Sequence, residues 1–313
     1  MNELASMAQI GALTDPTTHA EFLTFVLKDQ WLTVDDINDA LSQLPGIQKS
    51  IRQKDPSANI SVTIGFSANA WPLLFPDLSL PAELHVFPEM TDGARHFPST
   101  AGDIFLMVKS ERKDLNFQIA KYSAKALSGV ADLTEDIQGY KYLDNRDMID
   151  FVDGTENPID EERLESVLVD DENDTYRGGS YLVVQRYIDR QSLWDDQPTE
   201  HQEKVVGRTK MDDIELDDEE KPVWAHNNKS KVEIDGEEVK MYRQNRPYGN
   251  AIEHGTMFVG FSKTPSIIET SLTQMINADE NGDYDRLLDF VEAKTGASYF
   301  VPSQSFIDAH FDD

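Results

Sequence analysis

Ile104-Phe105-Leu106-Met107-Val108-Lys109 is an unbroken apolar run that ends on a lysine. A short run of this kind is typical of a buried strand. Residues 115–127 follow with the spacing of a helix, and residues 133–142 predict the next strand. This strand–helix–strand unit decides the fold class, because the segments on either side of it extend the same order.

The segments before this unit complete the first half of the chain. Residues 8–13 predict a short strand, and residues 60–66 predict another. Between them, residues 34–51 predict a helix, since apolar and polar residues recur at helical spacing and Asp35 and Asp36 stand near the positive end of the helix dipole. The first half therefore has the order βαββαβ.

The second half repeats this order loosely. It contains predicted strands at residues 180–187 and 256–262, predicted helices at residues 199–206, 266–276 and 284–293, and a hairpin at residues 232–242 around the turn Asp235-Gly236. The sequence predicts an α+β fold of two ferredoxin-like halves with antiparallel sheets, in a dimeric α+β barrel-like arrangement. We place the N-terminal domain at residues 1–145 and the C-terminal domain at residues 146–313.

The charge of the chain narrows the classes of partner. Acidic side chains number 58 and basic side chains 28, which gives a net charge of −30. Nucleic acids and anionic membrane surfaces require clustered Lys and Arg, so neither is an expected partner. The negative charge serves solubility or attracts cationic substrates, and composition leaves both interpretations open.

The chain contains no cysteine. This excludes disulfides, zinc-thiolate sites, iron–sulfur clusters, thiol catalysis and c-type haem attachment, so any haem is held without a thioether bond. The sequence starts without a secretory signal and has no apolar run long enough to span a membrane. We therefore expect a cytoplasmic protein.

Residues 151–158 carry the first group of chemical interest, and they read Phe-Val-Asp-Gly-Thr-Glu-Asn-Pro. Asp153 stands on a tight glycine turn, with the carboxylate of Glu156 and the amide of Asn157 beside it. Such an aspartate can accept a proton from a substrate and return it.

His226 and Arg243 flank the predicted hairpin. A lone histidine is more often structural than a metal ligand, but the hairpin returns Arg243 toward His226. Directly paired strands lie only about 5 Å apart and leave no space for a macrocycle, so strand pairing has to end before both residues if haem lies between them. Together with Asp153, these residues suggest a haem peroxidase site.

Peroxide cleavage needs each of these groups. A proton has to move from one peroxide oxygen to the other, which Asp153 can carry out directly or through a water. The guanidinium of Arg243 would stabilise the departing oxygen. A carboxylate bonded to the far nitrogen of His226 would make the imidazole a stronger donor to iron.

Four segments resemble the dye-decolourising peroxidases of the B-type branch. They are residues 149–158 (Ile-Asp-Phe-Val-Asp-Gly-Thr-Glu-Asn-Pro), 207–210 (Gly-Arg-Thr-Lys), 242–249 (Tyr-Arg-Gln-Asn-Arg-Pro-Tyr-Gly) and 299–303 (Tyr-Phe-Val-Pro-Ser). The similarity runs over almost the whole chain and is strongest from Gly139 onward. The resemblance implies a duplicated ferredoxin-like α+β fold whose second half holds b-type haem.

The resemblance also implies roles for individual residues. His226 matches the proximal iron ligand, Asp153 the distal aspartate and Arg243 the distal arginine, while Asn245 stands at the distal Asn or Ser position. Asp285 matches the acidic position before Leu287-Leu288, so it is the expected partner of His226. An exposed acid at the start of a helix, with Asp283 and Asp289 as neighbours, is the alternative interpretation of Asp285.

Arg208 is a candidate partner for a haem propionate, because a guanidinium binds a carboxylate bidentately, and a surface ion pair is the alternative. The chain departs from the family pattern Gly-x-x-Asp-Gly at one position, where Asp150 replaces the first glycine. Since aspartate tolerates positive φ less readily than glycine, the backbone of this turn is in question.

These residues predict a haem-dependent peroxidase that reduces hydrogen peroxide and oxidises dyes, phenols or similar small aromatic reductants. We also expect a homo-oligomer. A haem or porphyrin carrier or porphyrin-processing protein is one alternative, and an acidic interaction protein without haem is another. Several aromatic residues are either radical relays or ordinary packing residues: Trp194, Trp224, Tyr176, Tyr181, Tyr187, Tyr242 and Tyr248.

A calcium loop is a weaker alternative for residues 277–288. Asn277, Asp279, Asn281 and Gly282 imitate an EF-hand, but Leu288 stands where a bidentate glutamate is required. A turn that connects two helices explains the same residues.

Overall fold

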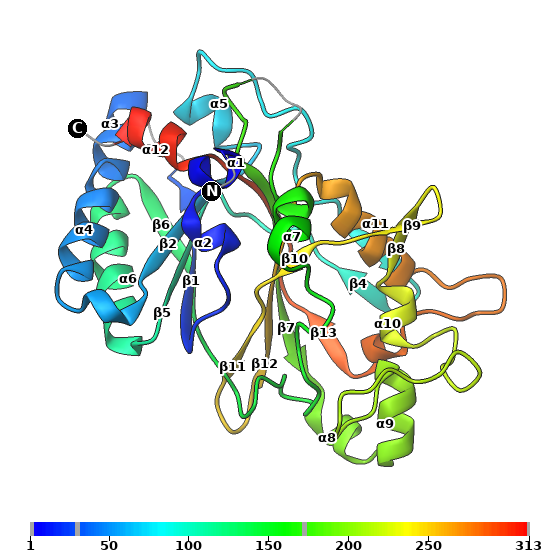
Figure 1. Ribbon diagram of the computed structural model, residues 1–313. Coiled ribbons are helices and arrows are strands. Elements are labelled where there is room, and N and C mark those ends of the chain that lie inside the picture. The colour runs from blue at the N-terminus through cyan, green and yellow to red at the C-terminus, as the bar shows by residue number, and fades with distance from the viewer. Residues whose placement is uncertain (1–2, 29–31, 171–173, 312–313) are drawn as a thin grey trace.

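The strands of the two halves close into one antiparallel β-barrel of eight strands (Figure 1). The computed structural model describes residues 3–28, 32–170 and 174–311 of the chain. The first half contributes β1 (His19–Leu27), β2 (Ser61–Phe66), β5 (Ile104–Ser110) and β6 (Ala131–Tyr140). The second half contributes β7 (Ser180–Asp189), β11 (Arg246–Gly249), β12 (His254–Ser262) and β14 (Ala297–Val301).

Each half has the strand order of a ferredoxin-like unit. The spatial order is β6-β1-β5-β2 in the first half and β14-β7-β12-β11 in the second, which is 4-1-3-2 in both cases. The halves meet where Phe300 of β14 pairs with Phe66 of β2 and where Tyr248 of β11 pairs with Gly139 of β6. The predicted α+β fold of two ferredoxin-like halves is confirmed.

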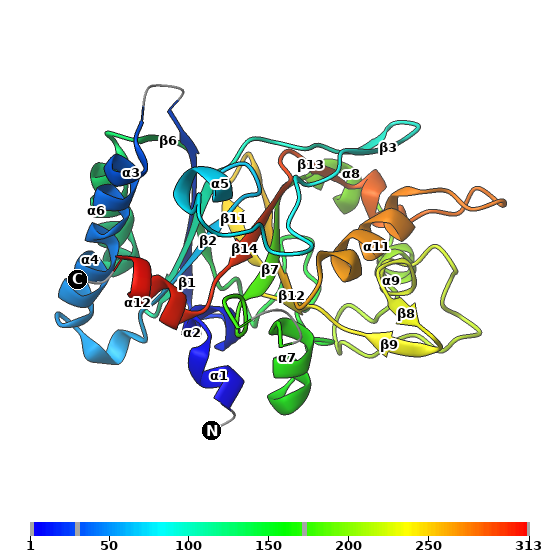
Figure 2. The same cartoon turned by 90° about the horizontal axis from the view of Figure 1, so that it is seen from above.

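Helices cover the barrel on two opposite sides (Figure 2). The side of the first half carries α3 (Val34–Leu41), α4 (Gln43–Arg52) and α6 (Lys113–Leu127). The side of the second half carries α8 (Gln191–Asp195), α9 (Thr199–Val206), α10 (His226–Lys229) and α11 (Pro265–Ile276). The other helices are α1 (Glu3–Met7), α2 (Ile10–Leu13), α5 (Trp71–Leu74), α7 (Asp160–Val167) and α12 (Gln304–Phe311), with 3-10 turns η1 (Pro56–Ala58) and η2 (Arg286–Asp289).

Short strands complete the sheets. They are β3 (Met90–Asp92) with β4 (Arg95–Phe97), β8 (Val232–Ile234) with β9 (Glu237–Val239), β10 (Tyr242–Arg243) on β12, and β13 (Val291–Ala293) on β7. No helix in the described ranges is both long and apolar enough to cross a membrane.

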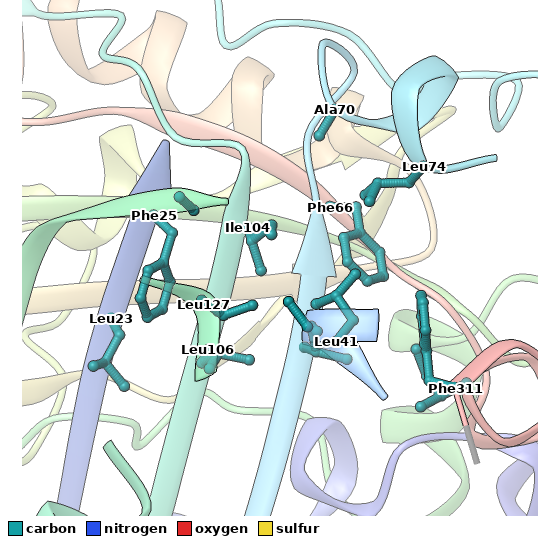
Figure 3. Close-up of a cluster of buried hydrophobic side chains, with 14 of the residues drawn as sticks. Leu23, Phe25, Leu41, Phe66, Ala70, Leu74, Ile104, Leu106, Leu127 and Phe311 are labelled. Atoms are coloured by element: carbon teal, nitrogen blue, oxygen red, sulfur yellow. The ribbon is translucent and has the colours of Figure 1, made fainter. Parts of the chain in front are cut away.

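Successive side chains of a strand point to opposite faces of the sheet, which divides the core into layers. In β5, Phe105 and Met107 point into the barrel, where they pack with residues of both halves. Ile104, Leu106 and Val108 point outward into the layer under α3, α4 and α6. Figure 3 shows that layer. Because both faces of β5 are buried, its sequence is a continuous apolar run.

Two sequence predictions are wrong. Residues 8–13 lie in and just before α2, and the first strand is β1 instead. Gln9 explains the difference: its side-chain amide donates to Ile64 O and Pro302 O and accepts from Ile64 N–H, so a side chain supplies the pairing expected of a strand. Residues 284–293 form η2 and β13 in place of a helix, because β13 pairs with the edge of β7.

The hairpin prediction is correct only in part. β8 and β9 pair around the Asp235-Gly236 turn, but Tyr242 and Arg243 leave the hairpin and form β10, which pairs with β12. The helix predicted over residues 34–51 is divided at Ser42 into α3 and α4. The remaining predictions agree with the structure within a few residues: strands 60–66, 104–109, 133–142, 180–187 and 256–262, and helices 115–127, 199–206 and 266–276.

Candidate active site

The segment between β6 and α7 holds Asp153 in a turn that is fixed by backbone hydrogen bonds. The Asp153 N–H donates to Asn145 O at 3.0 Å, and the Asn145 side-chain amide donates to Asp153 O at 2.9 Å. Gly154 follows with φ +85°, a conformation that glycine adopts at little cost. The main chain on both sides of Asp153 is thereby held in place.

Asp150 adopts a backbone conformation that glycine tolerates more readily than aspartate does. Its φ is +69°, in the left-handed region. The Arg146 guanidinium donates to Asp150 O at 2.8 Å, and Lys210 Nζ lies 3.5 Å from Asp150 Oδ2. Aspartate therefore occupies a positive-φ position in this turn, and two basic side chains hold it.

Arg243, in β10, contacts this turn through its main chain, which bonds to the Asn157 side chain, and Asn245 contacts the turn through its side chain. Asn245 Nδ2 lies 3.4 Å from Asp153 Oδ1, and Asn245 Oδ1 accepts the Val259 N–H at 3.2 Å. The half-buried Arg243 guanidinium has no hydrogen bond or ion pair to any residue that the structure describes. We call Asp153, Arg243 and Asn245 the turn cluster.

His226 begins α10, and its ring contacts a carboxylate from far along the chain. His226 Nδ1 lies 2.6 Å from Asp285 Oδ2, and Asp285 Oδ1 accepts the Leu287 N–H at 2.9 Å. Asp285 is fully buried, so the interpretation of this residue as an exposed helix-start acid is wrong. We call His226 and Asp285 the imidazole cluster.

The orientation of His226 follows from this contact. When Nδ1–H donates to Asp285, the other ring nitrogen, Nε2, carries a lone pair. Nε2 has no hydrogen bond within residues 3–28, 32–170 and 174–311. An imidazole oriented by a carboxylate at its other ring nitrogen is the arrangement that metal-binding histidines adopt in proteins.

One small core links the two clusters. Phe151 and Trp194 form its centre with ring centroids 6.0 Å apart, and Trp224 and Leu287 pack against it. Phe151 stands two residues before Asp153, Trp224 two residues before His226, and Leu287 two residues after Asp285. The two clusters therefore rest on common packing although their residues are far apart in sequence.

Arg208 is compensated by acidic neighbours. Its guanidinium donates to Asp213 Oδ1 and to the Asp213 carbonyl, each at 2.7 Å, and lies 3.0 Å from Glu156 Oε1. Thr155 Oγ1 also donates to Asp213 at 2.6 Å. These contacts fasten the loop after α9 to the Asp153 turn.

Two residues of this region had no role in the sequence interpretation. Asn157 bonds to the backbone of Arg243 through its side chain, and Asn145 supports Asp153. Asn157 was visible as the amide of the 151–158 motif, but its contact spans 86 residues and no sequence signal predicts it. Asn145 had no signal at all.

A cavity of about 160 Å³ lies elsewhere, against the strands of the barrel. Thr24, Glu135 and Tyr299 are among its lining residues, and none of the residues of either cluster lines it. Glu135 is engaged by Arg186 at 2.7 Å. This cavity is separate from the candidate site.

Sequence comparison identifies relatives of both halves. Residues 9–141 match the family described as "Dyp-type peroxidase, N-terminal", and residues 144–306 match "Dyp-type peroxidase, C-terminal". A dye-decolorizing peroxidase of Rhodococcus erythropolis is 38% identical over 299 residues, which cover 95% of this chain and 87% of that protein. One of Mycobacterium tuberculosis is 38% identical over 276 residues, which cover 87% and 82%.

Solved structures agree in fold over nearly the whole length. The encapsulated DyP-type peroxidase of Mycobacterium smegmatis superposes with a TM-score of 0.92 at 36% identity, covering 97% of this chain and 98% of that chain. A variant of DypB from Rhodococcus jostii RHA1, solved in complex with heme, gives a TM-score of 0.90 at 36% identity, covering 95% and 96%. From these matches, the chain belongs to the family of dye-decolourising, DyP-type peroxidases.

Proposed function

We propose that this protein is a B-type DyP peroxidase that binds haem b through His226. In this proposal it reduces hydrogen peroxide and oxidises dyes, phenols or similar one-electron donors. DypB variants of Rhodococcus jostii, solved in complex with heme, superpose on this chain with 36% identity and TM-scores of 0.90 and 0.91, which supports the branch and the cofactor.

The contact between His226 and Asp285 carries the proposal. The pair fits what a haem iron requires of a proximal histidine, namely a ring held in one orientation by a buried carboxylate at Nδ1, with Nε2 left for the iron. Haem bound there would supply the electrons that reduce peroxide and would regain them from the donor. The chain's own contribution is the Asp285 carboxylate, which orients the imidazole of His226.

The turn cluster would supply the acid–base chemistry of peroxide cleavage. The Asp153 carboxylate accepts the proton of one peroxide oxygen and delivers it to the other. The Arg243 guanidinium stabilises the charge that develops as water leaves, and it is available because no carboxylate among the described residues neutralises it. Asn245 holds the Asp153 carboxylate from the side at 3.4 Å.

We retain Arg208 as a proposed partner of a haem propionate, with a condition that the geometry imposes. Because Asp213 and Glu156 already engage its guanidinium, a propionate has to share it with them or displace one of them. We also propose domains at residues 1–145 and 146–313, a homo-oligomeric assembly and a cytoplasmic location.

Titration of the purified protein with haem, followed by hydrogen peroxide, tests the function. We expect one haem to bind per chain, a Soret band that shifts when peroxide is added, and oxidation of a phenol or an anthraquinone dye. Tight haem binding without peroxide-dependent turnover would favour the haem or porphyrin carrier. Failure to bind haem at all would refute the proposal.

A further inference from the structure

Asn157 stands four residues after Asp153 and belongs to the same turn. Its backbone N–H donates to Gly154 O at 3.1 Å. A Cβ on Gly154 would come 3.1 Å from Asn157 Nδ2, so the side chain lies directly against the turn. A displacement of Asn157 would therefore also displace the backbone beside Asp153.

The Asn157 side chain forms two hydrogen bonds with the main chain of Arg243. Nδ2 donates to Arg243 O at 2.8 Å, and Oδ1 accepts the Arg243 N–H at 3.0 Å. A residue in an antiparallel strand exchanges this pair of bonds with its partner residue. The primary amide of Asn157 thus takes the place of one residue of a neighbouring strand.

The position of β10 explains why Arg243 needs such a partner. β10 consists of only Tyr242 and Arg243 and lies at the edge of the sheet, with β12 on one side. Arg243 pairs with Gly260 there, and the Gln244 N–H donates to Val259 O at 2.8 Å. On the other side, Asn157 supplies the bonds that hold the main chain of Arg243.

A second set of contacts fixes the neighbouring residue independently. Gln244 is 2% exposed, and its amide donates to Gly11 O at 3.0 Å and Ala12 O at 3.1 Å. The buried Lys109 donates to the Gln244 side-chain oxygen. Gln244 is therefore anchored to the barrel and to α2. Asn157 ties the main chain of this anchored segment to the Asp153 turn, beside the side-chain contact of Asn245 with Asp153.

We propose that Asn157 is a positioning residue that sets the place of the Arg243 guanidinium relative to the Asp153 carboxylate. This inference rests on the proposed function and adds a residue that acts through Arg243 without touching peroxide. The effect of a misplaced group on a reaction of this kind is large, because proton transfer and charge stabilisation depend on atomic positions.

The test compares haem-loaded Asn157→Ala with the unmodified protein and with Asn250→Ala. Asn250 is a matched control, because its Oδ1 also accepts backbone N–H groups, those of Ile252 and Glu253, at an exposed turn away from both clusters. We expect Asn157→Ala to retain haem and its Soret spectrum, and to lower the rate constant for the reaction with peroxide roughly 10- to 100-fold, as expected for a displaced reacting group. The rate constant of Asn157→Ala for oxidation of the reductant should stay unchanged. In Asn250→Ala, both rate constants should equal those of the unmodified protein.

A double-variant cycle separates positioning from general loosening of the fold. If Asn157 acts through Arg243, adding Asn157→Ala to Arg243→Leu should change the peroxide rate constant by less than about threefold. A further drop as large as that of the single variant would overturn the proposal, and so would an unchanged rate constant in Asn157→Ala.

Asn157→Asp provides a second route if Asn157→Ala does not fold. It keeps the size of the side chain and the acceptor for the Arg243 N–H, but it places an oxygen opposite the Arg243 carbonyl, and we expect a similar loss. An unchanged rate constant would again overturn the proposal. If the unmodified protein binds no haem, the proposed function fails; if it binds haem and reacts with peroxide while both variants react equally fast, only the role of Asn157 fails.

Discussion

The two halves of the barrel share a strand order but differ in what lies on the outer face of the sheet. In the first half, α3, α4 and α6 pack on that face through a continuous aliphatic and aromatic layer (Figure 3). In the second half, the segment from residue 190 to residue 245 is inserted at the place where the first half has residues 28–60. It carries the loop with Arg208, the helix start with His226 and the strand with Arg243.

The buried carboxyl groups of the two halves show the same difference. In the second half, Asp285 is engaged by His226 and by a backbone N–H. In the first half, Glu21 is 1% exposed and lies beside the carboxyl of Asp136. Burial is the main cause that raises the pKa of Glu21 to about 8, and the neighbouring Asp136 is the second cause. The second half uses a buried acid to orient His226, the proposed iron ligand, and the first half holds a buried acid that favours its protonated form.

The largest expected effect is the loss of haem binding on substitution of His226, which lies in the second half. We expect His226→Ala to lose stable haem binding and peroxide-dependent turnover, because Nε2 of His226 is the proposed iron ligand. His85→Ala is the matched control, since His85 also contacts a carboxylate, Glu269, at 2.7 Å but lies at the surface. Haem titration followed at the Soret band measures both. Unchanged haem affinity in His226→Ala would break the contrast between the halves.

A substitution in the first half should affect stability and leave the chemistry intact. Leu106 is fully buried under the helices of that half, so Leu106→Ala should lower the free energy of unfolding by about 2–5 kcal/mol. Turnover per folded molecule should stay the same.

Leu288→Ala sharpens this test in the second half. Leu288 packs under α11, three residues after Asp285, so its loss should reduce turnover as well as stability. Denaturant unfolding and dye oxidation, measured on the same samples, would show whether the two halves respond differently. Equal losses of turnover in both variants would argue against a division of labour.

Glu21 gives the first half a pH dependence of stability. Since the pKa in the folded chain, about 8, lies above the ordinary value of 4.5, the folded chain binds more protons between these values, and stability falls as pH rises from 4.5 to 8. Glu21→Gln should therefore stabilise the protein at pH 8, by about 1–3 kcal/mol, and have little effect at pH 4. The exposed Glu200→Gln is the control for thermal unfolding across this range. A variant whose stability keeps the original pH slope would contradict the assignment.

The smallest effect is expected at Asp150, in the turn of the second half. Its φ of +69° costs a residue with a Cβ about 1 kcal/mol relative to glycine. Asp150→Gly should be more stable than Asp150→Ala by roughly this amount, as measured by thermal unfolding. Equal stability of the two variants would mean that the positive φ is lost on substitution.

Many local features were predictable because their signals are local. The apolar run of β5, the Asp235-Gly236 turn and the helix spacing of residues 115–127 each reflect rules that act over a few residues. β1 was missed because a helix–turn segment before it carried a similar apolar content. β13 was missed because it exists only by pairing with β7.

The sequence by itself determined that the chain would form two α+β halves, and it singled out Asp153, His226 and Arg243 as candidates for the peroxide and haem chemistry that we propose. Only the tertiary structure decided how the site is assembled. It closed the two sheets into one barrel, brought Asp285 to a histidine 59 residues away, and set Asn157 against the backbone of Arg243. The physical reason is that strand propensity and turn chemistry are written in neighbouring residues, whereas the pairing of distant polar groups depends on which buried surfaces come together.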